Sequence, residues 1–194
     1  MQITSAWRSR GRVVVDPKHY AVEETLKNGT AVTIRAARPG DGDKIREAFR
    51  NLEAETIYTR FFGYKTEVTD AELARITGSD FDQDVALLVT VGSNGTETVI
   101  GGASCFATDA AAPDRSAEIA FTVEEDYQGL GITSSLLRHL VRIARDKGLH
   151  RLEADVLARN LPMLSVFRRS GLPMTLRHEN DTVHVTLSLL PLAE

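Results

Sequence analysis

The chain has 194 residues, of which 42% are hydrophobic and 26% are charged, a composition typical of one globular domain. Its single cysteine, Cys105, excludes an internal disulfide framework and a cysteine-rich zinc site. The apolar runs fall well short of the ~20 residues that a membrane-spanning helix needs, and the N-terminus has no signal-peptide pattern. These observations predict a cytoplasmic protein with no membrane partner.

Charge is distributed unevenly along the chain, although the net charge is only −4. Residues 41–126 hold 7 Lys and Arg against 18 Asp and Glu, whereas residues 128–177 hold 9 against 3. The acidic net charge argues against a nucleic-acid partner. Blocks of like charge are most often solvated faces, but the basic block gains a function if a phosphate-bearing ligand binds there.

The first 30 residues have the pattern of a polar, irregular N-terminal extension, in which Val13–Val15 is a short apolar run that can add an edge strand. A single domain is expected from residue 31 to residue 190. Thr69 and Glu72 form a capping box before one of its helices. The first half of the domain is expected to contain one strand over 31–36 and helices over 43–52, 55–62 and 71–77.

The second half is rich in β-branched and apolar runs, interrupted by two helical patterns. Strands are expected over 85–91, 98–107, 116–123, 152–157, 175–178 and 183–189, and helices over 133–147 and 161–169. The Asn94-Gly95 pair predicts a hairpin turn. This order lacks the regular alternation of a doubly wound fold, so we predict an α/β (α+β) domain whose mixed, mostly antiparallel central sheet is flanked by helices.

The densest chemical signal is a glycine-rich turn between a strand and an amphipathic helix. It consists of Gln128, Gly129, Leu130, Gly131, Ile132, Thr133 and Ser134. Two glycines let the backbone approach a ligand closely, and the helix presents unpaired N–H groups, so a pyrophosphate fits such a turn. A tight chain reversal without a ligand explains the same residues. The spacing matches neither a P-loop nor the three-glycine dinucleotide fingerprint.

Gln128-x-x-Gly131-x-Thr133 resembles the coenzyme A signature of the GNAT superfamily of N-acyltransferases. Thr133 departs from the glycine or alanine of that signature, and we expect the backbone donors to remain in place. Residues 153–160 and 163–171 are similar to the family's splayed strand, its asparagine and its next helix. The resemblance spans about residues 31–190 and implies a GNAT-like domain with splayed strands at an acyl-CoA site.

The resemblance also implies which residues bind acetyl-CoA, the co-substrate of the family. Backbone groups of Phe121 and Val123 would pair with the pantetheine arm, and Asn160 would hydrogen-bond that arm from the neighbouring strand. Residues 128–134 would bind the phosphates. No metal is implied, and the five histidines show no metal-ligand spacing.

Glu118 is the candidate catalytic residue. Attack of an amine on a thioester needs a neutral amine, and a carboxyl group in an apolar strand close to the coenzyme is a suitable general base. The resemblance implies the same role. The alternative is an outward-facing carboxylate in a salt bridge. Many relatives place a tyrosine at the position of Phe167 as general acid, so Tyr127 and Ser170 become candidates for that step.

Arg35 with residues 38–41, and the stretch 55–62 that holds Tyr58 and Arg60, resemble the acyltransferase domain of bacterial protein lysine acetyltransferases. We therefore predict an acetyl-CoA-dependent N-acetyltransferase that acts on a protein lysine by direct attack in a ternary complex. One alternative acceptor is a small amine or polyamine. Another alternative, suggested by Thr133 and Phe167, is a non-catalytic acyl-CoA sensor. The oligomeric state, a dimer among the options, is left open.

Overall fold

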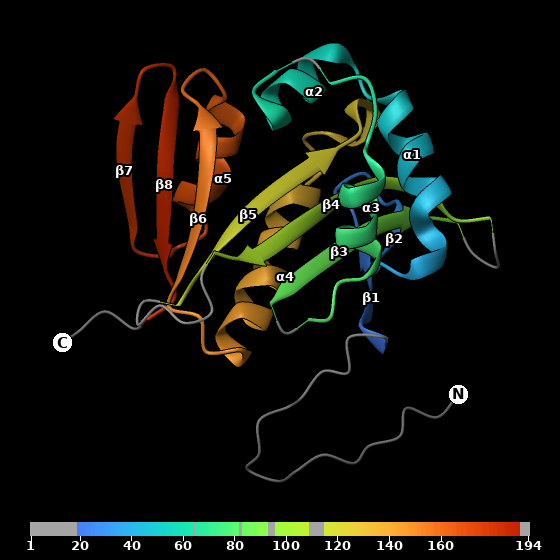
Figure 1. The fold of residues 1–194 in the computed structure, drawn as a ribbon, viewed down its shortest axis with the longest axis horizontal. Coiled ribbons are helices and arrows are strands. Elements are labelled where there is room, and N and C mark those ends of the chain that lie inside the picture. The colour runs from blue at the N-terminus through green and yellow to red at the C-terminus, as the bar shows by residue number, and fades with distance from the viewer. Residues whose placement is uncertain (1–18, 64, 82, 93–95, 109–114, 191–194) are drawn as a thin grey trace, which may run out of the picture.

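A computed structural model describes residues 19–190 except 64, 82, 93–95 and 109–114. The described chain forms one open sheet of eight strands in the order β1-β2-β3-β4-β5-β6-β8-β7 (Figure 1). The strands are β1 (Ala21–Thr25), β2 (Ala31–Ala36), β3 (Asp84–Val91), β4 (Thr98–Ala107), β5 (Ser116–Val123), β6 (Arg151–Leu157), β7 (Met174–Glu179) and β8 (Thr182–Ser188). Neighbouring strands are antiparallel except for β5 and β6, which are parallel. The predicted fold class is confirmed.

Helices cover both faces of the sheet, as Figure 1 shows. They are α1 (Gly42–Asn51), α2 (Ala54–Phe61), α3 (Asp70–Thr77), α4 (Ile132–Asp146) and α5 (Leu161–Arg169). One face packs against α4 and α5 and holds the main core, in which Leu136, Leu140 and Phe167 are almost fully buried. The other face carries α1, α2 and α3, with a smaller cluster around Leu88 and Val99. None of the described helices is long and apolar enough to cross a membrane.

The local signals in the sequence explain most element boundaries. The capping box before α3 is present, since Thr69 accepts from the Glu72 N–H and the Glu72 carboxylate accepts from the Thr69 N–H. Gly148, just beyond α4, adopts a positive φ of 71°, the conformation that ends a helix. The predicted Asn94-Gly95 turn lies outside the described residues.

The expectation of an irregular segment over residues 1–30 is wrong for residues 21–25. β1 forms there and pairs with β2 along its whole length, from Ala21↔Arg35 to Thr25↔Ala31. The sequence pattern misses this strand because Val22 is its one β-branched apolar residue, and the two glutamates that follow have low β-propensity. Val13–Val15 lies outside the described residues.

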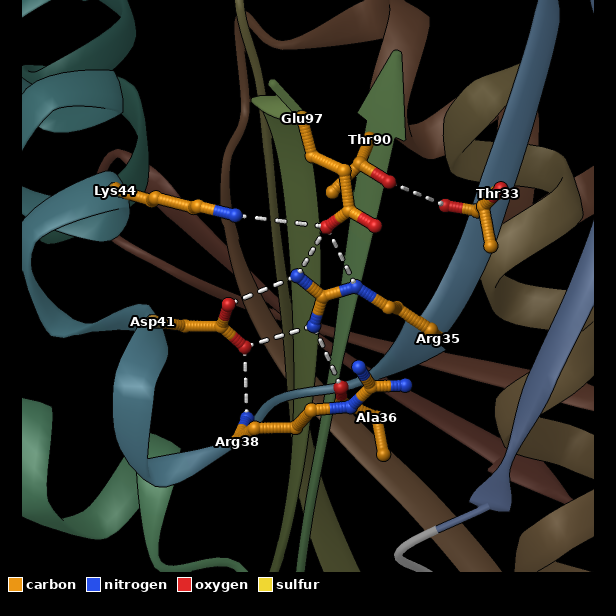
Figure 2. A network of polar contacts seen from close by, with 8 residues as sticks. All are labelled: Thr33, Arg35, Ala36, Arg38, Asp41, Lys44, Thr90 and Glu97. Atoms are coloured by element: carbon orange, nitrogen blue, oxygen red, sulfur yellow. Dashed lines mark hydrogen bonds and ion pairs between the residues drawn. The ribbon is translucent and has the colours of Figure 1, made fainter. Parts of the chain in front are cut away.

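A buried charge network fixes the connection from β2 to α1 (Figure 2). The Arg35 guanidinium donates to both carboxylate oxygens of Asp41, at 2.7 and 2.8 Å, and to Glu97 at 2.9 Å. Arg35 and Asp41 are only 2% and 4% exposed, and Lys44 lies 3.6 Å from Glu97. Asp41 stands at the N-cap of α1, but its carboxylate accepts from Arg35 and from the Arg38 N–H instead of capping the helix.

Arg35→Met is expected to lower the free energy of unfolding by about 3–5 kcal/mol, because it leaves the buried Asp41 carboxylate without its partner. Arg46→Met removes an ion pair whose Asp70 partner is exposed, and should cost less than about 1 kcal/mol. Urea unfolding followed by circular dichroism measures both values. Equal losses would mean that the buried network stabilises the fold no more than a surface pair.

Candidate active site

A cleft of about 910 Å³ opens where β5 and β6 separate. The two strands pair over three positions, from Ser116↔Arg151 to Glu118↔Glu153, and then diverge, as Figure 1 shows. Beyond Glu118, the edge of β5 that faces β6 therefore has no strand partner, and its backbone groups, apart from the Val123 carbonyl that accepts from Gln128, are available to a ligand. β5, β6, α2, α5 and the turn before α4 all contribute to the lining.

The cleft brings together most of the predicted site residues, which come from three separate stretches of the sequence. Those that line it are Glu118, Phe121, Val123, Gln128, Gly129, Gly131, Ile132, Thr133, Ser134 and Asn160. Leu130 is outside the lining because its side chain packs against the main core. Its position in the turn nevertheless matters, since its carbonyl oxygen accepts from the Lys27 N–H at 3.3 Å.

The glycine-rich turn has the geometry of an anion site. Gly129 and Gly131 have φ angles of +73° and +100°, a region that residues with a Cβ rarely adopt. No atom lies within 4 Å of the position that a Cβ on Gly129 would occupy, so the backbone there is open to a ligand. The N–H of Ser135 makes the first helical bond of α4, to Gly131, which leaves the N–H groups of residues 132–134 without a helical acceptor. These groups and the helix dipole favour a phosphate.

Glu118 lies on the face of β5 that carries α2 and α3. Its neighbours Ala117 and Ile119 are buried on the opposite face, so the side chain of Glu118 is exposed to the cleft instead of lying in the expected apolar surround. Strand alternation explains this difference. The Arg60 guanidinium is close enough to the Glu118 carboxylate to interact with it electrostatically. Burial lowers the pKa of Arg60, and the negative charge of Glu118 partly offsets that lowering.

Gln128 and Asn160 each have part of their side chain engaged by the protein. The Gln128 amide donates to the Val123 carbonyl at 3.1 Å and to the Thr56 hydroxyl at 3.2 Å, which joins the turn to α2. The Asn160 Oδ1 atom caps α5 by accepting from the Met163 N–H at 3.1 Å. The amide nitrogen of Asn160 therefore remains as the group that can donate into the cleft.

The candidates for general acid differ in position. Phe167 is 1% exposed and belongs to the main core, where its ring centroid lies 6.2 Å from that of Phe121, and its side chain has no proton to donate. The Ser170 hydroxyl donates to the Phe167 carbonyl at 2.7 Å and does not line the cleft. Tyr127 does line it. Of the two residues, Tyr127 is therefore the one that lines the cleft.

Two contacts of the cleft were missed by sequence reasoning. Arg159 reaches from the end of β6 to Glu55 of α2 at 3.2 Å and lies over the Tyr58 ring, which connects both sides of the cleft. Lys27, in the hairpin between β1 and β2, donates from Nζ to the Gly129 carbonyl at 3.4 Å. No local pattern marks either contact, because each joins segments that are about 100 residues apart.

A polar cluster holds β1 against α4, close to the turn. Glu24 accepts from Arg138 at 2.6 Å, from Ser135, and from Nε2 of His139 at 2.8 Å. A carboxylate can only accept, so His139 donates from Nε2, and in the neutral ring Nδ1 accepts from the Tyr20 hydroxyl. Burial alone would raise the pKa of Glu24, but these hydrogen bonds dominate and lower it to about 2.

Comparisons with known proteins agree with this geometry. The model of the acetyltransferase (GNAT) family matches residues 47–172. The chain belongs to the GNAT acetyltransferase family. An acetyltransferase of Pseudomonas aeruginosa is 31% identical over 161 residues, which cover 83% of this chain and 84% of that protein. The acetyltransferase Pat of Mycolicibacterium smegmatis is 32% identical over 146 residues, covering 75% of this chain but 42% of that protein.

The crystal structure of the GNAT domain of S. lividans PAT superposes with a TM-score of 0.80. The alignment covers 89% of this chain and 98% of that domain, at 28% identity. The chain is thus an acetyltransferase with a GNAT fold, and acetyl-CoA is the acetyl donor of its family. The family model begins at residue 47, so β1, β2 and the hairpin that holds Lys27 lie before the matched region.

Glu24→Gln is expected to make the stability of this GNAT domain less sensitive to acid. The folded-state pKa of about 2 lies below the ordinary value of 4.5, so the carboxylate stabilises the fold above pH 4.5, and this contribution is lost as the pH falls towards 2. Urea midpoints at pH 7 and pH 3 measure the effect. The wild type should lose more stability between these values than Glu24→Gln, and parallel losses would contradict the assignment.

Gly131→Val is expected to weaken acetyl-CoA binding at least tenfold, or ~1.4 kcal/mol, because a branched side chain at φ +100° distorts the turn and covers its N–H groups. Isothermal titration calorimetry measures the affinity. Gly171→Val is the matched control, since Gly171 has φ +74°, open space around it and no place in the cleft lining. Similar affinities for the two variants would remove the turn from the binding site.

Proposed function

We propose that this GNAT acetyltransferase moves the acetyl group of acetyl-CoA onto a primary amine, with a protein lysine as the favoured acceptor. The observation that carries this proposal is the shared cleft: a carboxylate, a free strand edge and an anion-binding turn all line it. The reaction forms a bond between the amine nitrogen and the carbonyl carbon, breaks the carbon–sulfur bond and needs no acyl-enzyme. The protein has to bind both substrates, accept the ammonium proton and return a proton to the thiolate.

The residues of the cleft fit acetyl-CoA. The N–H groups of residues 132–134 and the open backbone at Gly129 suit the pyrophosphate. The unpaired edge of β5 beyond Glu118 suits the amide groups of the pantetheine arm, and the Asn160 amide nitrogen can donate to the same arm. The Val123 carbonyl already accepts from Gln128, so its N–H is the group of Val123 proposed for this contact.

Glu118 is proposed as the general base. It stands at the last paired position of β5, where the strands separate and the cleft begins. A lysine amine has a reference pKa of about 10.4, so it arrives protonated at neutral pH and must lose a proton before it attacks. Because its side chain is exposed to the cleft, Glu118 can accept that proton directly or through one water.

The acceptor is assigned from the resemblance to protein lysine acetyltransferases and from the position of Glu118. A lysine side chain is long and unbranched, so it can carry an amine to Glu118 while its backbone stays on the surface of the partner protein. A small amine or polyamine is the second candidate, and the acidic groups of the lining, Glu55, Glu118 and Asp155, would attract it equally well. The Tyr127 hydroxyl is proposed to return a proton to the departing thiolate.

Glu118→Gln is expected to reduce turnover by ~10²–10⁴-fold near pH 7, since glutamine keeps the size of the side chain but cannot accept a proton. Acetyl-CoA affinity should stay within a few-fold of wild type. Raising the pH should restore part of the loss because solvent then deprotonates more of the amine. Release of free thiol is the measurement, over a panel of lysine-containing proteins and small amines.

Glu153→Gln is the control for this experiment. Glu153 pairs with Glu118 across the β5–β6 ladder and is also a carboxylate, but it does not line the cleft. It should therefore keep activity within a few-fold of wild type. Normal turnover of Glu118→Gln would mean that the base lies elsewhere. A wild type that binds acetyl-CoA but acetylates no amine in the panel would favour the non-catalytic sensor.

A further inference from the structure

We propose that Lys27, in the hairpin between β1 and β2, is a phosphate-binding residue of the acyl-CoA site. The proposal rests on the proposed binding of acetyl-CoA at the glycine-rich turn. It assigns a part of the coenzyme site to the N-terminal hairpin, which lies before the region matched by the family model.

The contacts of Lys27 place its charge at the turn. Its ammonium group lies 3.4 Å from the Gly129 carbonyl oxygen, and its Cε atom lies 3.6 Å from the position that a Cβ on Gly131 would occupy. Its backbone N–H donates to the Leu130 carbonyl at 3.3 Å, so the hairpin itself is attached to the turn. Lys27 also lines the same cleft as Glu118.

The contact with Gly129 is weak enough to be exchanged for a ligand. A separation of 3.4 Å is at the long end for a hydrogen bond, and the side chain of Lys27 is exposed. A phosphate oxygen carries a full negative charge, whereas the carbonyl carries only a partial one. The ammonium group of Lys27 is therefore expected to leave the Gly129 carbonyl and to bind a phosphate oxygen of acetyl-CoA when the coenzyme is present.

Other cations of the lining have different positions. Arg60 lies near Glu118, in the part of the cleft assigned to the acceptor, and Arg159 is paired with Glu55. Arg169 also lines the cleft, from the C-terminal end of α5. The glycine-rich turn carries no Lys or Arg of its own between residues 128 and 134. The backbone of the turn supplies partial charges, and Lys27 adds the full positive charge that a pyrophosphate needs for strong binding.

The hairpin is held in place by a cluster that is independent of the ligand. Glu24, three residues before Lys27, is fixed to the first turns of α4 through Ser135, Arg138 and His139. His139 is 7% exposed and also contacts Tyr20, at the start of the same segment. Because α4 begins at the turn, this cluster positions Lys27 relative to the N–H groups that bind the phosphates.

Lys27→Met is the test, because methionine keeps much of the apolar stem and removes the charge. Calorimetry at low salt should give about 5–20-fold weaker acetyl-CoA binding, as expected for a charge-assisted contact. Lys27→Arg should stay within about threefold of wild type. Lys147→Met is the matched control: it also removes one positive charge, but at the far end of α4, about 22 Å away for a helix of this length. It should leave the affinity unchanged.

S-acetylpantetheine, which lacks the phosphates, separates charge recognition from a structural effect. Its binding, followed by protein NMR shifts, should be equal in wild type and Lys27→Met. An unchanged acetyl-CoA affinity in Lys27→Met, or equal losses for both compounds, would overturn the role of Lys27. If the wild type does not bind acetyl-CoA, both the proposed function and this inference are wrong. If Gly131→Val loses acetyl-CoA binding and Lys27→Met does not, only the role of Lys27 is wrong.

Discussion

The short parallel pairing between β5 and β6 is the constraint on which the site depends. Three residue pairs hold the strands together, and beyond Glu118↔Glu153 the strands diverge. A longer ladder would close the cleft and occupy the backbone groups that face it. Next to the cleft, Phe167 of α5 packs against Phe121 of β5, with 6.2 Å between the ring centroids. The short pairing of β5 with β6 is therefore the common cause of the cleft, of the free strand edge and of the access to Glu118.

The parallel pairing of β5 and β6 also determines the position of α4 and of its helix dipole. A parallel connection needs a crossover, and α4 provides it by running across the face opposite to α1, α2 and α3. The first turn of α4 thus lies beside the end of β5, at the cleft. The same helix carries the residues that bind Glu24 of β1. One helix therefore serves the core, the glycine-rich turn of the cleft and the attachment of the N-terminal hairpin.

Charges of opposite sign lie close together at several points in this molecule. Arg35, from the segment before the acidic block, is neutralised by Asp41 and Glu97 in a buried network (Figure 2). Glu118 has Arg60 nearby, from within the acidic block. The cleft lining accordingly mixes both signs, with Lys27 at the turn and Glu118 at the point where the strands part.

The sequence by itself determined what depends on short spacing. Apolar periodicity located α4 and the strands of the sheet other than β1, Thr69 and Glu72 marked the start of α3, and the glycines at 129 and 131 marked the turn that lines the cleft. Tertiary structure alone decided which face of β5 carries Glu118, where β5 leaves β6, and that Lys27 contacts the turn. These features depend on contacts between segments that are far apart in the chain, and the free energy of such contacts is not encoded in any local pattern of residues.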